Sequence, residues 1–219
     1  MLGITIDRNL SFETHIANIC RKAHCKLTAI ARYSKLLDFN KIRTLVKSFV
    51  ESQFSYCPLV WMFHNRKINT KINHLHERAL RLVYADDMST FEELLKRDGA
   101  FTIHQRNIQC LAIEMFKVKN RMGPTLLGDI FIVREYYGPT LRTNSDFIIP
   151  NINSVHFGEN SLQYFGGKIW NLIPSNIKNT NNLECFKSLI RNWAPDICPC
   201  KLCKLYIQNV GYIEHITNR

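Results

Sequence analysis

Two carboxylates stand side by side at Asp86 and Asp87, directly after Tyr84 and Ala85. Paired aspartates at a hairpin turn, joined by a third carboxylate, can hold two Mg²⁺ ions for phosphoryl transfer. Asp7, which ends an apolar segment, is the candidate for the third carboxylate. The local pattern opposes this chemistry, because helical periodicity precedes Tyr84, a new helix begins after Asp87, and no glycine occurs from Ile4 to Asp98. We therefore expect both aspartates to lie in a helix-to-helix connection, with no catalytic residue among them.

Three cysteines gather near the end of the chain, at Cys198, Cys200 and Cys203. A structural zinc site needs four tetrahedral ligands, usually with pairs spaced Cys-x2-Cys, and Cys200 and Cys203 fit that spacing. Cys185 and His215 are both open as the fourth ligand. The sequence thus favours reduced thiols near the surface, with a structural zinc site at these cysteines as the alternative prediction. A disulfide framework is not expected from the eight cysteines, because no secretory signal precedes them.

Positive charge is concentrated in the first third of the chain. The formal net charge is +11, and the segment from Arg8 to Arg81 holds 14 Lys and Arg against four acids, a net charge of +10. Residues 124–219 hold nine basic and seven acidic groups, a net charge of +2. A surface of this kind is typical of contact with phosphates, which gives affinity without sequence selectivity, although a merely soluble basic face remains the alternative. The candidate contact residues are Arg21, Lys22, Lys26, Arg32, Lys35, Arg43 and Lys47.

Apolar residues spaced three and four apart predict the helices that carry these cations. Capping residues indicate where each helix begins. The expected helices begin at Ser11, Asp38, about Arg66, the Ser89–Glu92 capping box and the Thr102–Gln105 capping box, and the last ends at Gly123-Pro124. Before them, the alternation from Leu2 to Ile6 predicts a short strand. Because the chain opens within that strand, we expect it to be truncated.

The remaining sequence predicts a less regular region. Residues 124–160 are rich in Gly, Pro, Asn and β-branched residues, which favours loops and short strands, and helices return at 161–172 and 182–193. We expect a mainly α fold: a short strand and helical bundle over residues 1–123, then an irregular α+β region over 124–219. No apolar run is long enough to span a membrane, so we expect an intracellular protein, nuclear or cytoplasmic.

Several blocks of the sequence resemble reverse transcriptases of non-LTR retrotransposons, of the LINE type and jockey-like kind. The match begins with Leu-Gly-Ile-Thr-Ile-Asp at 2–7, followed by Leu-Ser-Phe at 10–12 and His-Ile at 15–16. Three further blocks follow in the family's order, at 52–61, 72–81 and 103–107, and the cysteine block at 198–203 is also similar. The resemblance covers essentially the whole chain.

The resemblance implies that the chain is the part of the polymerase that follows the catalytic palm. Residues 2–7 would brace the primer end, and the helices from Phe12 to Val83 would form a thumb-like bundle holding template–primer RNA and DNA. A separate palm domain would supply catalysis, with Mg²⁺ needed only in the parent polymerase and no cofactor expected here. Two alternatives stay open. The first is an active reverse transcriptase that uses Asp86 and Asp87, because Tyr84–Asp87 has the sequence of the family's metal-binding box. The second is an inert product of a degraded element.

Overall fold

The computed structural model describes residues 3–134, 146–152, 158–195 and 198–199. These residues form two compact units, divided between Asn107 and Ile108. This division falls inside a helix, sixteen residues before the boundary at residue 123 that the sequence suggested. Each unit is described by itself below.

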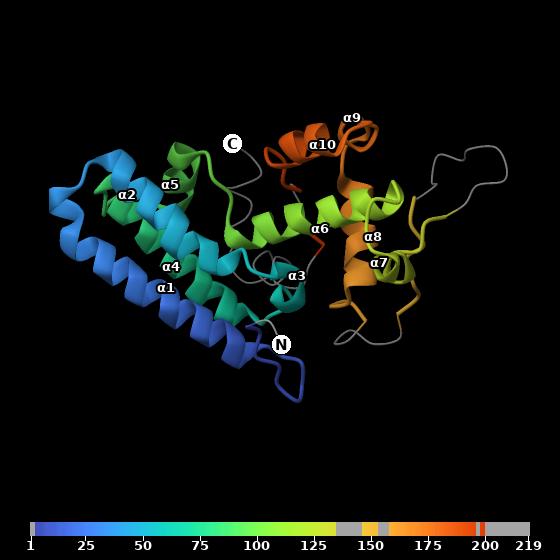
Figure 1. Ribbon diagram of the computed structural model, residues 1–219, viewed down its shortest axis with the longest axis horizontal. Coiled ribbons are helices and arrows are strands. Elements are labelled where there is room, and N and C mark those ends of the chain that lie inside the picture. Colours follow the sequence, from blue (N-terminus) through green and yellow to red (C-terminus); the bar gives the residue numbers. More distant parts are fainter. Residues whose placement is uncertain (1–2, 135–145, 153–157, 196–197, 200–219) are drawn as a thin grey trace. The chain divides into compact units, whose positions relative to one another are not determined.

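Long amphipathic helices build the first unit (Figure 1). The helix α1 (Glu13–Tyr33) packs along α4 (Arg66–Tyr84) and against η2 (Val46–Val50), and α5 (Phe91–Asp98) packs on α4. The element η2 is a π-helical turn. It follows α2 (Phe39–Leu45) and continues into the 3₁₀ helix η3 (Glu51–Phe54) without a break. Two short helices complete the unit, η1 (Ser34–Leu36) and α3 (Pro58–Trp61).

The predicted stripe on α1 is the side that is buried. Ile16, Ile19, Ala23, Leu27 and Ile30 are all less than 9% exposed and pack in one apolar core with the inner side of α4. Full burial of each of the larger side chains contributes roughly 1.5–3 kcal/mol, so this interface holds the bundle together. The outer side of α1 is consequently free to carry charge.

Capping side chains fix where α2, α5 and α6 begin, whereas α1, predicted to begin at Ser11, has no side-chain cap and follows Phe12. The Asp38 carboxylate accepts a hydrogen bond from the Lys41 amide, as predicted. The predicted box at Ser89 and Glu92 lies one residue further on: Thr90 and Glu93 bond each other's amides. Thr102 and Gln105 form the box predicted for α6. Gly99, with a φ of 61°, ends α5 because its left-handed conformation costs glycine little.

The second unit is built around stacked aromatic rings. Its helices are α6 (Ile103–Lys119), which crosses the division, α7 (Thr125–Ile130), α8 (Leu162–Leu172), α9 (Ser175–Lys178) and α10 (Leu183–Ile190). Phe116 stacks on Phe186 with ring centroids 4.2 Å apart, and Trp170 lies 6.1 Å from the same ring. Trp170 is fully buried, whereas Trp193 is only partly buried.

Two parts of the expected fold are not found. Gly3–Ile6, the described part of the predicted leading strand, form no strand. The Asp7 carboxylate instead accepts hydrogen bonds from the Asn9 and Ser11 amides, and this turn leads the chain directly into α1.

The predicted α+β character of the C-terminal region is likewise not found among the described residues. They contain one isolated bridge, between Val133 and Phe147, and otherwise helices. The β-branched content of this region misled the interpretation, since Pro124 sets up a helical turn where loops and strands were expected. The mainly α class is confirmed. None of the helices in the described ranges combines the length and apolar content that a membrane crossing requires.

Candidate nucleic-acid interface

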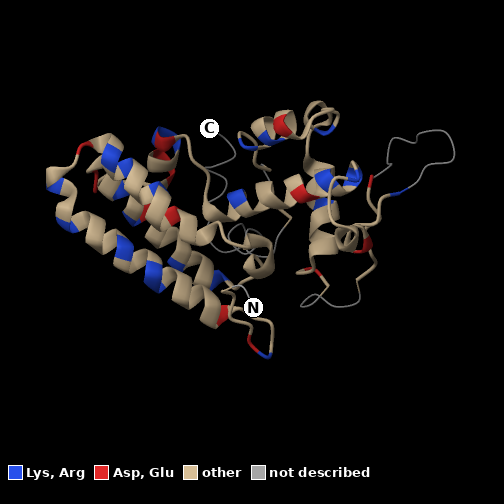
Figure 2. Ribbon diagram, viewed as in Figure 1, with Lys and Arg blue, Asp and Glu red and all other residues tan. Residues whose placement is uncertain are grey.

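The structure places five of the predicted cations on or just after α1 (Figure 2). Arg21, Lys22, Arg32 and Lys35 are exposed. Lys26 is half-buried, with its Nζ atom 5.9 Å from the centroid of the Phe49 ring. Among the described residues, no carboxylate lies within ion-pairing distance of any of the five. Their charge is therefore available to an external anion.

The other two predicted cations, Arg43 and Lys47, face a buried carboxylate. The Arg43 Nε atom lies 2.8 Å from Asp98 Oδ1, and the Lys47 Nζ atom lies 3.6 Å from Asp98 Oδ2. The Tyr84 hydroxyl donates to the same Oδ1 atom at 3.0 Å. Because Asp98 is 55 residues from Arg43, helical spacing could not reveal this pairing. Arg43 and Lys47 neutralise an internal charge, which makes them weaker candidates for phosphate contact than the five above.

The five cations on α1 and η1 divide between two flanks of the helix. Steps of seven and eleven residues are close to whole helical turns, so Arg21, Thr28, Arg32 and Lys35 point in similar directions. Thr28 and Lys35 both line a cleft between α1 and α4, which places that flank beside α4. Lys22 and Lys26 lie on the other flank, where Lys26 reaches Phe49 of η2.

A row of cations on α4 extends the first flank, and sequence reasoning passed over it. Lys67, Lys71 and Arg78 are exposed and follow one another by four and seven residues, so they share a helix face. The Arg78 Nη1 atom lies 3.2 Å from His24 Nδ1 of α1, and burial raises the pKa of Cys20 on α1, a rise that the nearby Lys71 charge partly offsets. The spacing was visible in the sequence, and the contacts with α1 were not.

Together these residues define a cationic surface that we call the α1–α4 face: Arg21, Arg32, Lys35, Lys67, Lys71 and Arg78. None of the six pairs with an acid among the residues described. Glu77, the single acid of α4, is partly buried and pairs with Arg81 at 2.7 Å. The face thus presents uncompensated positive charge on the adjacent helices α1 and α4 and on η1, which suits a polyanion.

The adjacent carboxylates Asp86 and Asp87 lie in the connection between α4 and α5, as predicted. Asp86 accepts hydrogen bonds from the Ser89 hydroxyl and amide and from the Met88 amide, and it pairs with Arg97 at 2.8 Å. These contacts, those with Ser89 first, hold the Asp86 pKa well below its usual range. The carboxylate therefore acts as a clamp on the turn that leads into α5.

Asp7 lies far from this pair. Glu13, six residues after Asp7, accepts a hydrogen bond from Asn65 at the start of α4, whereas Asp86 follows the end of that helix. A helix of 19 residues is about 28 Å long, and carboxylates that share a two-metal site lie around ions only about 4 Å apart. Asp7 and Asp86 therefore cannot form one two-metal site in this fold.

The predicted zinc ligands lie mostly outside the described residues. Cys198 is buried, while Cys200, Cys203 and His215 fall beyond the described ranges, and Cys185 is exposed on α10. Over the parts of the chain that the structure describes, no three His, Cys, Asp or Glu side chains gather in an arrangement that would hold a metal ion. The zinc site stays a prediction.

A buried polar cluster occupies the interior of the first unit. Arg106 Nη1 donates to Glu51 Oε2 at 2.5 Å, and His76 Nε2 lies 3.9 Å from Glu51 Oε1. Burial, with the nearby Arg106 charge, lowers the pKa of His76 to about 4. The His76 ring is 2% exposed and packs edge-on against Phe91, so this cluster serves the core and not an external ligand.

Comparisons with known proteins identify no relative. No family model matches the chain, and neither the curated proteins nor the solved structures contain a match.

Proposed function

We propose that the chain binds nucleic acid through the α1–α4 face, as the non-catalytic part of a retrotransposon reverse transcriptase that holds template–primer. One observation carries the binding proposal: six exposed cations lie on α1, η1 and α4, and none is neutralised by an acid among the described residues. The sequence resemblance supports the narrower assignment to the segment after the palm. RNA and DNA are the proposed partners, and catalysis is assigned to a separate palm domain.

Unpaired cations of this kind favour nucleic acid for a physical reason. Each Lys or Arg that contacts a phosphate releases condensed counterions, so the logarithm of the affinity falls linearly with the logarithm of the salt concentration. Phosphate contacts carry no sequence information, and binding through this face should therefore be sequence-independent. If all six cations contact phosphates of a duplex, the slope of log K against log salt is about −5.

The salt slope of the full chain tests the proposal. We expect a labelled duplex to bind with a strongly negative slope in fluorescence anisotropy titrations from low to physiological salt. The double variant Lys71→Gln/Arg78→Gln should make that slope shallower by about 2, because it removes two phosphate contacts.

A matched control separates the face from overall charge. Lys41→Gln/Lys96→Gln also removes two positive charges, but Lys41 pairs with Asp38 at 2.8 Å and Lys96 pairs with Glu92 at 3.1 Å. This control should leave the slope nearly unchanged. Binding that does not depend on salt, or equal changes in both double variants, would contradict the proposal.

A further inference from the structure

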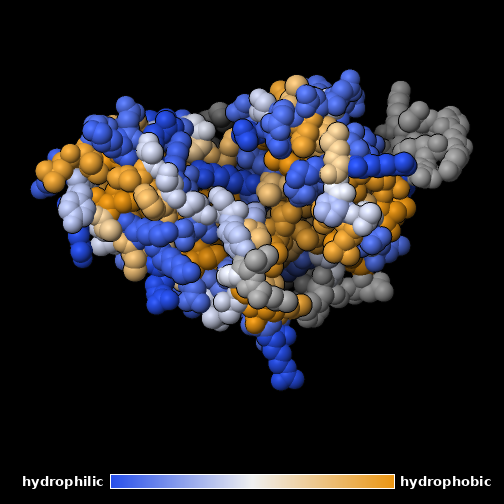
Figure 3. All heavy atoms as spheres, in the orientation of Figure 1, coloured by the Kyte–Doolittle hydropathy of each residue, from blue (hydrophilic) through white to orange (hydrophobic). Residues whose placement is uncertain are grey.

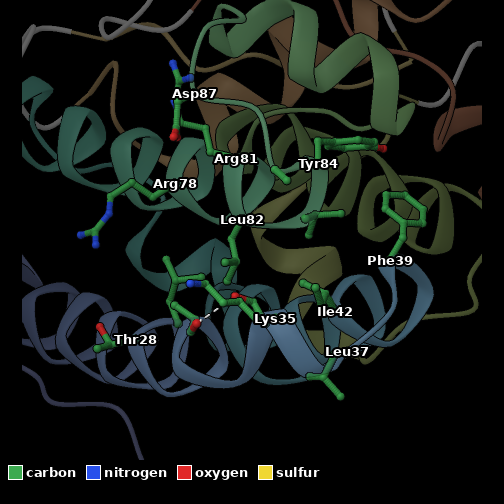
Figure 4. A pocket seen from close by; sticks show the side chains of 15 residues that line it. Thr28, Lys35, Leu37, Phe39, Ile42, Arg78, Arg81, Leu82, Tyr84 and Asp87 are labelled. Atoms are coloured by element: carbon green, nitrogen blue, oxygen red, sulfur yellow. Dashed lines mark hydrogen bonds between the residues drawn. The ribbon is translucent and has the colours of Figure 1, made fainter.

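An apolar cleft opens between the ends of α1 and α4 (Figure 4). Its volume is about 780 Å³, within the range typical of small-molecule sites. Leu82 points from α4 toward α1 in the middle of the cleft, with Thr28 and Arg78 at one end and Phe39 and Tyr84 at the other. Leu27, Ala31, Leu37 and Ile42 add to the apolar lining.

Aromatic side chains flank one end of this cleft. The Phe39 and Tyr84 rings lie 5.4 Å apart at an angle of 53°, and Phe39 is 42% exposed. The hydrogen bond from the Tyr84 hydroxyl to Asp98 fixes the Tyr84 ring in place. Figure 3 shows apolar surface near the turn between α1 and α2, bordered by hydrophilic residues. The Arg97 guanidinium lies over the Tyr84 ring, 5.4 Å from its centroid, so the exposed Phe39 ring is the π-face offered to a flat apolar group.

Cations border the same cleft. Lys35 and Arg78 line it and lack an acid partner among the described residues, whereas Arg81 pairs with Glu77. Asp87 is the one acid among the lining residues, and it lies beside Arg81 (Figure 4). A ligand that places a flat ring in the cleft and an anionic group on Lys35 and Arg78 would match this pattern of charge. A nucleotide has both parts.

Lys35 and Arg78 also belong to the α1–α4 face, so the cleft opens directly onto that surface. We infer that the cleft takes one unpaired base of the bound strand, with the adjoining phosphate on Lys35 and Arg78. This inference rests on the proposed function and narrows its substrate to nucleic acid with a single-stranded segment beside the duplex.

The experiment compares two probes on the full chain: a blunt RNA–DNA duplex, and the same duplex with a short single-stranded overhang that carries 2-aminopurine. Stacking of a base on an aromatic side chain is worth about tenfold in affinity, so the overhang should bind roughly tenfold more tightly. The 2-aminopurine fluorescence should fall on binding, because the base stacks in the cleft.

Two variants on one helix locate the base. Ala31 lines the cleft and is exposed, so Ala31→Trp should fill the cleft and remove the tenfold gain while leaving blunt-duplex affinity unchanged. Ala29 is also exposed but faces the flank of Lys22, seven residues away, so Ala29→Trp should change neither probe. Phe39→Ala provides a second test that fills no space, and it should reduce the gain and the quenching.

The outcomes distinguish this inference from the proposed function. Salt-dependent binding of both probes with equal affinity overturns the base site and leaves the proposed function standing. A gain that survives both Ala31→Trp and Phe39→Ala, in variants whose circular dichroism is native, also overturns it. If neither probe binds at low salt, the proposed function fails and the base site fails with it.

Discussion

The two compact units bury different kinds of side chain. The first unit encloses Glu51, His76 and Asp98 in its interior, with Arg106, Arg43 and Lys47 set against the carboxylates. The second unit stacks aromatic rings, and its main polar anchor is Asp146, which accepts from Trp170 and Lys119. A core that holds charges depends on exact pairing, whereas an aromatic core depends on shape. The units should therefore respond to different perturbations.

Truncation of Trp170 should give the largest effect, because it tests the aromatic core directly. The side chain is fully buried between Phe147 and Phe186, and its Nε1 atom donates to Asp146 Oδ2 at 2.7 Å. Trp170→Ala should lower the free energy of unfolding by about 3–5 kcal/mol, measured by urea denaturation. Tyr33→Ala, at an aromatic side chain 61% exposed in the first unit, should cost far less. A loss below about 1 kcal/mol for Trp170→Ala would show that the rings do not support the second unit.

Acid should act mainly on the first unit, through His76. Burial lowers the folded-state pKa of His76 to about 4, whereas the unfolded chain takes up this proton near pH 6.5. The unfolded state thus binds more protons between these values, and stability falls as the pH drops from about 6.5 toward 4, by up to about 3 kcal/mol. His76→Gln should remove this part of the pH dependence in urea unfolding across that window.

A matched substitution makes this measurement specific. His74 is exposed on the same helix, with its Nδ1 atom 3.6 Å from Glu77 Oε2, and His74→Gln should leave the fall in stability that comes from His76 in place. Equal pH profiles for the unchanged chain and His76→Gln would mean that His76 can accept a proton inside the fold.

Asp86 and Asp87 should give the smallest effect, and an unequal one. Asp86 holds the turn between α4 and α5 through Ser89 and Arg97, while Asp87 is exposed and has no such contacts among the described residues. Asp86→Asn should lower the melting temperature measurably, because it weakens charge-assisted bonds, and Asp87→Asn should not. Neither should change duplex binding. Mg²⁺-dependent primer extension that both substitutions abolish would instead favour the active polymerase reading.

Helices with a strong apolar period could be predicted from the sequence. The apolar spacing of α4 predicted the end of that helix to within one residue. The caps at Asp38 and Thr102 were also predicted correctly. These features are local, so neighbouring residues determine them. The short helix α7 was missed, because its residues carry no period long enough to detect.

Pairing across the fold could not be predicted from the sequence. Arg43 meets Asp98 only because α2 and the end of α5 approach each other, and a lysine or arginine looks the same in the sequence whether or not an acid lies opposite. Counting cations therefore pointed to the first third of the chain without separating Arg43 and Lys47 from the unpaired ones. The same reason hid the cleft, which exists only where α1, η1, α2 and α4 converge.

The wide turn η2 has a consequence for insertions and deletions. Ile42, Val46 and Val50 are buried at steps of four residues, which a π-helical turn keeps in line, and Glu51 follows them into the core to meet Arg106. Loss of one residue from Val46–Val50 would close the wide turn to an ordinary α-helical one and keep Glu51 facing the core, whereas loss of one residue from the α-helical Phe39–Leu45 would rotate the later positions by about 100°. Tolerance to length change in this segment is therefore set by electrostatics, because the helical position of Glu51 decides whether its carboxylate meets the Arg106 guanidinium or is buried without a partner.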